Sequence, residues 1–216
     1  TAYEIASCLV GSEMCIRDSL YEAGGTCPTT GVPKPARAKF CRTTRRVVAR
    51  FDHFCPWVNN AVGEENYRWF LLFLASHALL LAYGAACAAL LLRDVVDAKQ
   101  LMRATFYLGD APVAATRGVV VHYLLHTERL LCALLLACAV LGAVVAGFLG
   151  YHLRLVWRGR TTNEHYKWRR RARGGAAPAA NVYDLGALRN AHEVLFPRSR
   201  RRDALARYRA KREKGD

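Results

Sequence analysis

Asp52, His53 and Cys55 place a carboxylate, an imidazole and a thiol within four residues of one another. A thiol attacks as its thiolate, and a neighbouring imidazole can take the proton while a carboxylate orients the ring. A long apolar run begins shortly downstream, at Trp69. We therefore interpret the three residues as nucleophile, base and orienting acid, placed at a bilayer surface to act on a thioester whose acyl chain lies in lipid.

Two long apolar runs predict the class of the protein. Residues 69–92 and 130–153 are each 24 residues long and contain no Lys, Arg, Asp or Glu. About 20 apolar residues suffice to cross a bilayer as a helix. The chain also combines 53% hydrophobic residues with a net charge of +15. This combination is typical of an α-helical integral membrane protein with basic cytosolic segments. It does not favour a nucleic-acid-binding domain, because the apolar residues are concentrated in these two blocks.

The distribution of basic residues predicts the orientation of the two runs. Residues 22–68 carry eight Lys and Arg, and residues 154–216 carry 18. The connecting residues 93–129 carry five, against four acidic residues. Because Lys and Arg collect on the cytosolic side, both flanking regions are expected to be cytosolic and the connection non-cytosolic. Cys55 would then face a reducing compartment, where a thiol stays free.

The remaining segments are more polar. Residues 1–21 match nothing downstream and resemble translated sequencing-adapter DNA, so we interpret them as non-native; an unusual native N-terminus is the alternative. Residues 22–68 contain closely spaced Pro and Gly and are predicted to form loops and short hairpins. A small helix or strand is expected within 119–125. Residues 197–216 read as a basic helix or a disordered tail that meets anionic lipid.

Three separated pieces of this sequence together resemble one known family. The first covers residues 27–67 and includes the string Asp52–Asn60; the second is Thr-Thr-Asn-Glu at residues 161–164; the third covers residues 181–186. Their order and spacing around the two apolar runs resemble the DHHC family of protein S-acyltransferases, or palmitoyltransferases.

The resemblance implies where the two apolar runs belong. Family members usually have four spans, with the catalytic domain between the second and the third. Here both runs follow that domain, so they correspond to the third and fourth spans. We therefore expect the chain to be N-terminally incomplete, a multi-pass endomembrane protein of the Golgi, ER or plasma membrane with a cytosolic catalytic face.

The resemblance also assigns roles to individual residues. Cys55 would accept a long-chain acyl group from palmitoyl-CoA, with His53 as base and Asp52 as its partner, and pass it to a cysteine of a substrate protein near the membrane. Trp57, Phe70 and Phe73 are implied to line an acyl cavity. Lys34, Arg37 and Lys39 are implied to contact the CoA phosphates. Aromatic residues at the bilayer interface, and a basic face toward water or anionic lipid, are the alternatives for these two sets.

Four further residues are implied to be structural supports. Thr162 and Glu164 belong to the family's TTxE motif, and Thr162 is expected to contact Asp52. Asn181 should brace that motif, and Tyr183 should pack the C-terminal module onto the membrane domain.

The sequence departs from the family at the metal sites. The family binds two zinc ions, each through three Cys and one His, whereas the aligned positions here contribute only one Cys to each site; these positions are Cys27, Thr30, Phe40 and Val47, and Cys41, Thr44, Phe54 and Ala61. Structural zinc requires four N or S ligands. We therefore predict that no metal is bound and that apolar packing replaces it; a decayed domain that does not fold is the alternative.

Two functions from different classes stay open at this point. The intact Asp52, His53 and Cys55 favour an active palmitoyltransferase, with membrane lipid, palmitoyl-CoA and cysteine-bearing proteins as partners and no nucleic acid. The lost zinc ligands favour a catalytically inactive membrane scaffold or regulatory partner. A two-span adaptor with a vestigial resemblance is disfavoured by the intact TTxE and C-terminal motifs.

Overall fold

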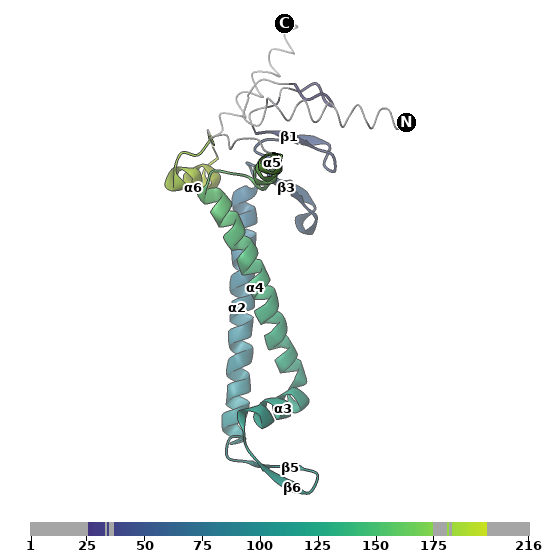
Figure 1. Ribbon diagram of the computed structural model, residues 1–216, viewed down its shortest axis with the longest axis vertical. Helices are drawn as coiled ribbons and strands as arrows, with labels where there is room; N and C mark the ends of the chain where they lie inside the picture. The colour runs from purple at the N-terminus through teal and green to yellow at the C-terminus, as the bar shows by residue number, and fades with distance from the viewer. Residues whose placement is uncertain (1–25, 33, 35–36, 175–180, 182, 198–216) are drawn as a thin grey trace, which may run out of the picture. The chain divides into compact units, whose positions relative to one another are not determined.

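The computed structural model describes residues 26–32, 34, 37–174, 181 and 183–197. Residues 1–21, interpreted as non-native, and residues 198–216 of the basic tail therefore lie outside the described residues. The chain divides into two compact units (Figure 1). One consists of residues 1–71 and 151–216, and the other of residues 72–150.

Two short antiparallel hairpins form the N-terminal part of the first unit. Strands β1 (Lys39–Cys41) and β2 (Arg46–Val48) form one, and β3 (His53–Cys55) and β4 (Asn60–Val62) form the other. The second hairpin turns through a short 3₁₀ helix, η1 (Pro56–Val58). Pro56 begins this turn with a fixed φ, and Asn59 ends it in the left-handed region, which Asn tolerates better than most residues.

A small apolar core joins the two hairpins. Cys41, Phe51 and Ala61 are buried together, with Val48 and Phe54 packed against them. Gly63 allows this close packing, because a Cβ at that position would lie 2.5 Å from Val48 Cγ1. The hairpins therefore pack through side chains and through one backbone approach that only glycine permits.

Two helices complete the first unit, α5 (Thr162–Arg173) and α6 (Ala187–Leu195). A capping box begins α5: Thr161 Oγ1 accepts from the Glu164 N–H, and Glu164 Oε2 accepts from the Thr161 N–H. The buried Asn190 holds α6 by donating from Nδ2 to Trp157 O at 3.1 Å and to Asp184 Oδ1 at 2.7 Å.

The longest helices are α2 (Tyr67–Ala98, 32 residues) and α4 (Arg129–Trp157, 29 residues). Each contains one of the predicted apolar runs and is long and apolar enough to cross a membrane. Large side chains such as Leu79, Leu130 and Leu136 are exposed along them. Because lipid would cover such side chains, these helices fit a membrane protein.

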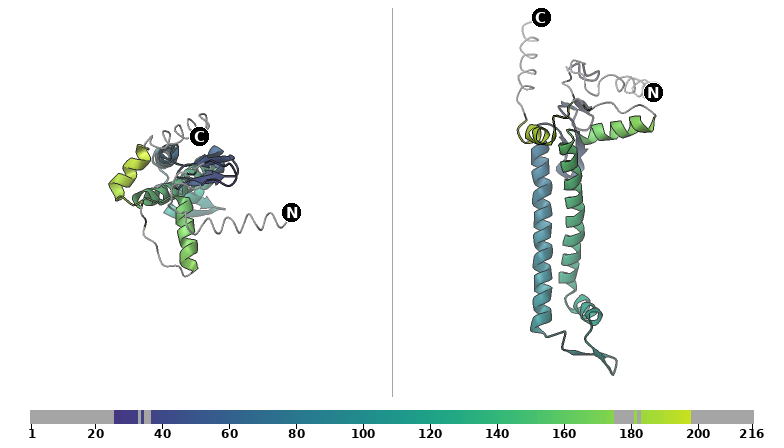
Figure 2. Two further views of the ribbon diagram at one scale, coloured as in Figure 1. Left: turned by 90° about the horizontal axis from the view of Figure 1, so that it is seen from above. Right: turned by 60° about the vertical axis from the view of Figure 1, so that its left-hand side comes forward.

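Within the second unit, the two long helices lie side by side, and a hairpin and a short helix connect them (Figure 2). Glycines allow the approach: a Cβ on Gly84 would lie 3.1 Å from Cys138 Sγ, and one on Gly142 would lie 3.3 Å from Leu81 Cβ. The connection contains β5 (Thr105–Leu108), β6 (Ala111–Ala114) and α3 (Arg117–Thr127). Of the two forms expected within 119–125, the structure has the helix.

Candidate active site

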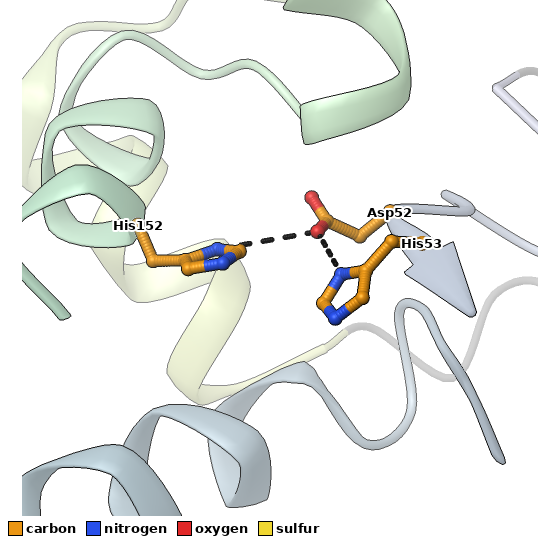
Figure 3. A group of neighbouring side chains, drawn as sticks. All are labelled: Asp52, His53 and His152. Carbon is orange, nitrogen blue, oxygen red and sulfur yellow. Dashed lines mark hydrogen bonds and ion pairs between the residues drawn. The ribbon is translucent and has the colours of Figure 1, made fainter. Parts of the chain in front are cut away.

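Asp52 and His53 form a close pair at the entrance to β3 (Figure 3). Asp52 Oδ2 lies 2.6 Å from His53 Nδ1, and the carboxylate is almost fully buried. The carboxylate favours the tautomer with hydrogen on Nδ1, which leaves Nε2 able to accept a proton. Among the described residues, this buried Nε2 has no hydrogen-bond partner.

The thiol lies on the same side of the strand as the imidazole. His53 and Cys55 are two residues apart in β3, and side chains at this spacing share a face of a strand. Cys55 is 4% exposed, and the Phe70 ring meets the His53 ring edge-on at 5.0 Å between centroids. The imidazole and the thiol therefore lie on one face of β3, with the Phe70 ring against the imidazole.

The first turn of α5 holds Asp52 from the other side. The Thr162 N–H donates to Asp52 Oδ1 at 2.7 Å, and the Asn163 N–H donates to the Asp52 carbonyl at 3.2 Å. Backbone N–H groups at a helix N-terminus favour a negative charge. Thr162, which the resemblance placed beside Asp52, thus reaches it through its backbone.

Arg37 occupies a different place from the one expected. Its guanidinium donates to both carboxylate oxygens of Glu164 at 2.6 Å and to Gly159 O at 2.9 Å, and it stacks over the Tyr183 ring at 4.8 Å. These contacts use Nε and Nη2, and the residue is buried. Arg37 thus joins the hairpins to the TTxE motif, and its contact with CoA phosphates stays a prediction.

Asn181 and Tyr183 brace the turn that leads into the TTxE motif. Asn181 Nδ2 donates to Arg158 O at 2.9 Å, and its Oδ1 accepts from the Tyr183 N–H at 3.3 Å. The Tyr183 ring faces the Arg37 guanidinium, and its packing of the C-terminal module onto the membrane domain stays a prediction.

Sequence reasoning missed a third lysine, Lys167 on α5, whose positive charge Lys34 and Lys39 repel. Burial, and next the repulsion from Lys39 and Lys34, hold the pKa of Lys167 below its ordinary value. Lys39 Nζ also donates to Asn163 Oδ1 at 3.2 Å, which joins β1 to the TTxE motif. Cationic side chains that repel one another in this way are a candidate site for an anionic group.

The three aromatic residues expected around the acyl chain have different environments. Phe70 is buried beside His53. Trp57 is 91% exposed, and Phe73 is partly exposed beside the ring of His77, at 4.2 Å between centroids. The described residues therefore join only Phe70 to the acid–imidazole–thiol group.

At the positions that align with the family's two zinc sites, each site has one cysteine, and threonines or apolar residues stand at the other positions. Phe40 pairs with Val47 across the first hairpin, and Phe54 pairs with Ala61 across the second. Burial alone would raise the pKa of the Cys27 and Cys41 thiols, but hydrogen bonds from the neighbouring Thr29–Thr30 and Thr43–Thr44 segments outweigh it and keep both pKa values below the ordinary value. The residues present do not fit a four-ligand zinc site.

One other donor set lies within the site itself. Ligand atoms of Asp52, His53 and His152 all lie within 4.8 Å of one another (Figure 3). These residue types could hold a transition metal. The 2.6 Å separation within the Asp52–His53 pair is, however, a hydrogen-bond distance, so a metal would have to displace the shared proton.

His152 and its neighbour Tyr67 were also missed by sequence reasoning. A signal was present, because His152 is the only histidine in the apolar run 130–153. An imidazole in such a run is costly to bury and often marks a functional site.

Comparison with known proteins adds independent information. A sequence model of the DHHC palmitoyltransferase family matches residues 21–169. Palmitoyltransferase ZDHHC4 of Mus musculus is 34% identical over 193 residues, which cover 83% of this chain and 56% of that protein. Palmitoyltransferase SWF1 of Yarrowia lipolytica is 36% identical over 142 residues, covering 66% and 36%. Palmitoyltransferase ZDHHC5-A of Danio rerio is 34% identical over 171 residues, covering 78% and 19%. The chain spans about half the length of ZDHHC4 and less of the other two.

Proposed function

The chain belongs to the DHHC palmitoyltransferase family, and on this premise we propose that the whole protein transfers a long-chain acyl group from acyl-CoA to cysteines of other proteins. The observation that carries the proposal is the 2.6 Å contact between Asp52 and His53. It supports a base whose ring is fixed by an acid, on the same strand face as the Cys55 thiol.

The first step makes an acyl-enzyme. The Cys55 thiol gives its proton to His53 Nε2, and its sulfur attacks the carbonyl carbon of the thioester. A new thioester bond forms to Cys55 as the bond to CoA breaks, and the CoA sulfur takes the proton from the imidazolium. Asp52 stabilises the charged imidazole between these events.

The second step repeats the same chemistry with another thiol. A substrate cysteine gives its proton to His53 and attacks the acyl-Cys55 carbonyl, and the departing Cys55 sulfur takes the proton back. Each step exchanges one thioester for another, so positioning and the exclusion of water contribute most of the acceleration.

The lysines and aromatic residues belong to the same proposal. Lys34 and Lys39 meet the CoA phosphates together with Lys167, because both lysines repel the Lys167 charge and an anionic group would offset that repulsion. Phe70 lines the start of the acyl path beside His53. Trp57 and Phe73 are exposed apolar surface that a membrane or an acyl chain would cover.

The membrane placement is also proposed. Helices α2 and α4 are assigned as the third and fourth spans of a multi-pass endomembrane protein whose catalytic face is cytosolic. The basic residues that flank both helices support this orientation.

We further propose that the domain folds without zinc. Cys41, Phe54 and Ala61 belong to one apolar cluster, so the positions that would hold a metal supply packing. The loss of ligands also supports a second candidate function, a catalytically inactive scaffold or regulatory partner.

Acyl-enzyme formation separates these two functions. The full-length protein in detergent is incubated with labelled palmitoyl-CoA, and hydroxylamine-sensitive label is measured. Label is expected on the native protein and on the control variant Cys132→Ser, which changes a thiol in α4 outside the first unit. Cys55→Ser should not be labelled, and His53→Ala should be labelled slowly. No label on well-folded native protein would favour the scaffold, and unchanged label on Cys55→Ser would overturn the assigned nucleophile.

A further inference from the structure

His152 lies at the end of α4 that belongs to the same compact unit as Asp52. It is 1% exposed and lies among aromatic rings, with ring centroids 5.1 Å from Phe70, 5.3 Å from Tyr151 and 5.7 Å from Tyr67. All three contacts are edge-on. Such packing leaves the imidazole little freedom to rotate.

The polar edge of this ring points to the catalytic acid (Figure 3). His152 Nδ1 lies 3.9 Å from Asp52 Oδ2 and 2.9 Å from Tyr67 Oη. A nearby carboxylate favours the tautomer with hydrogen on Nδ1, which then donates to the phenol oxygen while its positive edge faces Asp52. The tyrosine thus fixes the ring, and the ring faces the carboxylate.

The two oxygens of Asp52 are then held from different directions. Oδ1 accepts from the Thr162 N–H at 2.7 Å. Oδ2 pairs with His53 Nδ1 at 2.6 Å and faces the His152 edge at 3.9 Å. We propose that His152, fixed by Tyr67, is a positioning residue that shares the charge of Asp52 with His53 and so sets the strength of the catalytic base.

The Phe70 ring packs against both imidazoles. Its ring lies 5.0 Å from His53 and 5.1 Å from His152, and the two imidazole centroids are 5.6 Å apart. A movement of one imidazole would therefore disturb the other. Because Tyr67 is in α2 and His152 is in α4, the ends of both long helices contribute to holding one carboxylate of the hairpin domain.

The inference rests on the proposed acyl transfer, and its effect follows from electrostatics. With both imidazoles present, the negative charge of Asp52 is divided between them. Without His152, that charge stabilises the imidazolium of His53 more strongly, so His53 keeps its proton to a higher pH. The titratable groups facing His152 are Asp52, His53, Tyr67 and Tyr151.

The test uses His152→Phe, which keeps a ring, and Tyr67→Phe, which removes only the hydroxyl. The rate of acyl-enzyme formation is measured against pH and palmitoyl-CoA concentration in the full-length protein. His152→Phe should lower the saturating rate roughly tenfold, the loss of about one hydrogen-bond-sized interaction with a charged group. Half-saturation should stay unchanged, and the acid limb should move to higher pH. Tyr67→Phe should lower the rate and move the acid limb in the same directions by smaller amounts. His126→Phe, which replaces an exposed histidine of α3, should change neither the rate nor the acid limb.

A readout that needs no activity separates this inference from the proposed function. The imidazole ¹⁵N signals of His53 are titrated by NMR in the same variants. A midpoint that moves upward in His152→Phe supports charge sharing even if the native protein forms no acyl-enzyme, an outcome that would remove only the proposed function. An unchanged midpoint, or a pH profile that only falls in height, would overturn the inference.

Discussion

Thr162 holds Asp52 through its backbone: the Thr162 N–H donates to Asp52 Oδ1 at 2.7 Å. Thr162 is also the first residue of α5, because Thr161 is the N-cap. The first helical position is the place where a helix tolerates proline best, since its N–H has no partner within the helix.

Thr162→Pro should therefore remove one donor to the Asp52 carboxylate and leave α5 intact. Thr161, with φ −98° and ψ 161°, already has the extended conformation that precedes proline. A hydrogen bond to a charged group contributes about 1.5–3 kcal/mol, so the acylation rate should fall roughly ten- to hundredfold. Thr162→Ala keeps the N–H and should retain most of the activity. Equal losses in the two variants would show that the side chain is what matters.

The buried ion pair of Arg37 and Glu164 should be a main determinant of stability. Their side chains are 2% and 4% exposed, with Nε and Oε1 2.6 Å apart. Glu164→Gln keeps the capping box but leaves a buried cation without its charge partner, which should cost roughly 3–5 kcal/mol. Arg37→Met combined with Glu164→Gln should recover part of the loss in thermal unfolding measurements. Glu193→Gln is the matched control, because Glu193 is more exposed and lies 3.9 Å from Arg50; its effect should be small.

The features that sequence reasoning can reach are local ones. Asp52, His53 and Cys55 are neighbours in the chain, and the apolar runs predicted α2 and α4 because a span depends only on length and hydropathy. Sequence reasoning cannot reach distant partners: Arg37 pairs with Glu164 across 127 positions of the chain. No local sequence pattern shows whether a basic residue binds a ligand or pairs with an acidic residue elsewhere in the chain. His152 was missed for the same reason, since its partners lie in the hairpin domain and at the start of α2.

Gly159 should tolerate no side chain. Its φ is +59°, and a Cβ there would lie 3.0 Å from both Asn190 Oδ1 and Tyr183 O. Gly159→Ala should therefore cost the roughly 1–2 kcal/mol of a left-handed alanine and also displace Asn190, which holds α6 to Trp157 O. Limited proteolysis should then cut near α6 at lower protease concentration. Gly31→Ala is a matched control, because Gly31 has φ +64° but open space around it; equal effects in both variants would leave strain as the only cause.

Metal removal should leave the protein folded. Cys41, Phe51 and Ala61 form an apolar core, so a chelator has nothing to extract from it. Purified protein should contain far less than one zinc per chain, and its unfolding temperature should be the same with and without the chelator. A family member that retains all eight ligand positions should lose stability under the same treatment. Stoichiometric zinc whose removal unfolds this protein would contradict the prediction.

Lys167 should lower the stability of the fold and strengthen the binding of CoA. Burial, then Lys39 and Lys34, lower its pKa, so the fold disfavours its charged form relative to the unfolded chain. Below the folded-state pKa the lysine is protonated in both states, and the cost is present in full; it disappears as pH rises from the folded pKa to the unfolded one. Lys167→Gln should therefore raise the unfolding temperature at pH 7, by an amount that shrinks toward pH 11.

The same variant should bind CoA more weakly and with a shallower dependence on salt, because an anion offsets the repulsion among the lysines. Arg173→Gln, at the far end of α5, should change neither quantity. A variant that binds CoA as tightly as the native protein would remove Lys167 from the phosphate site.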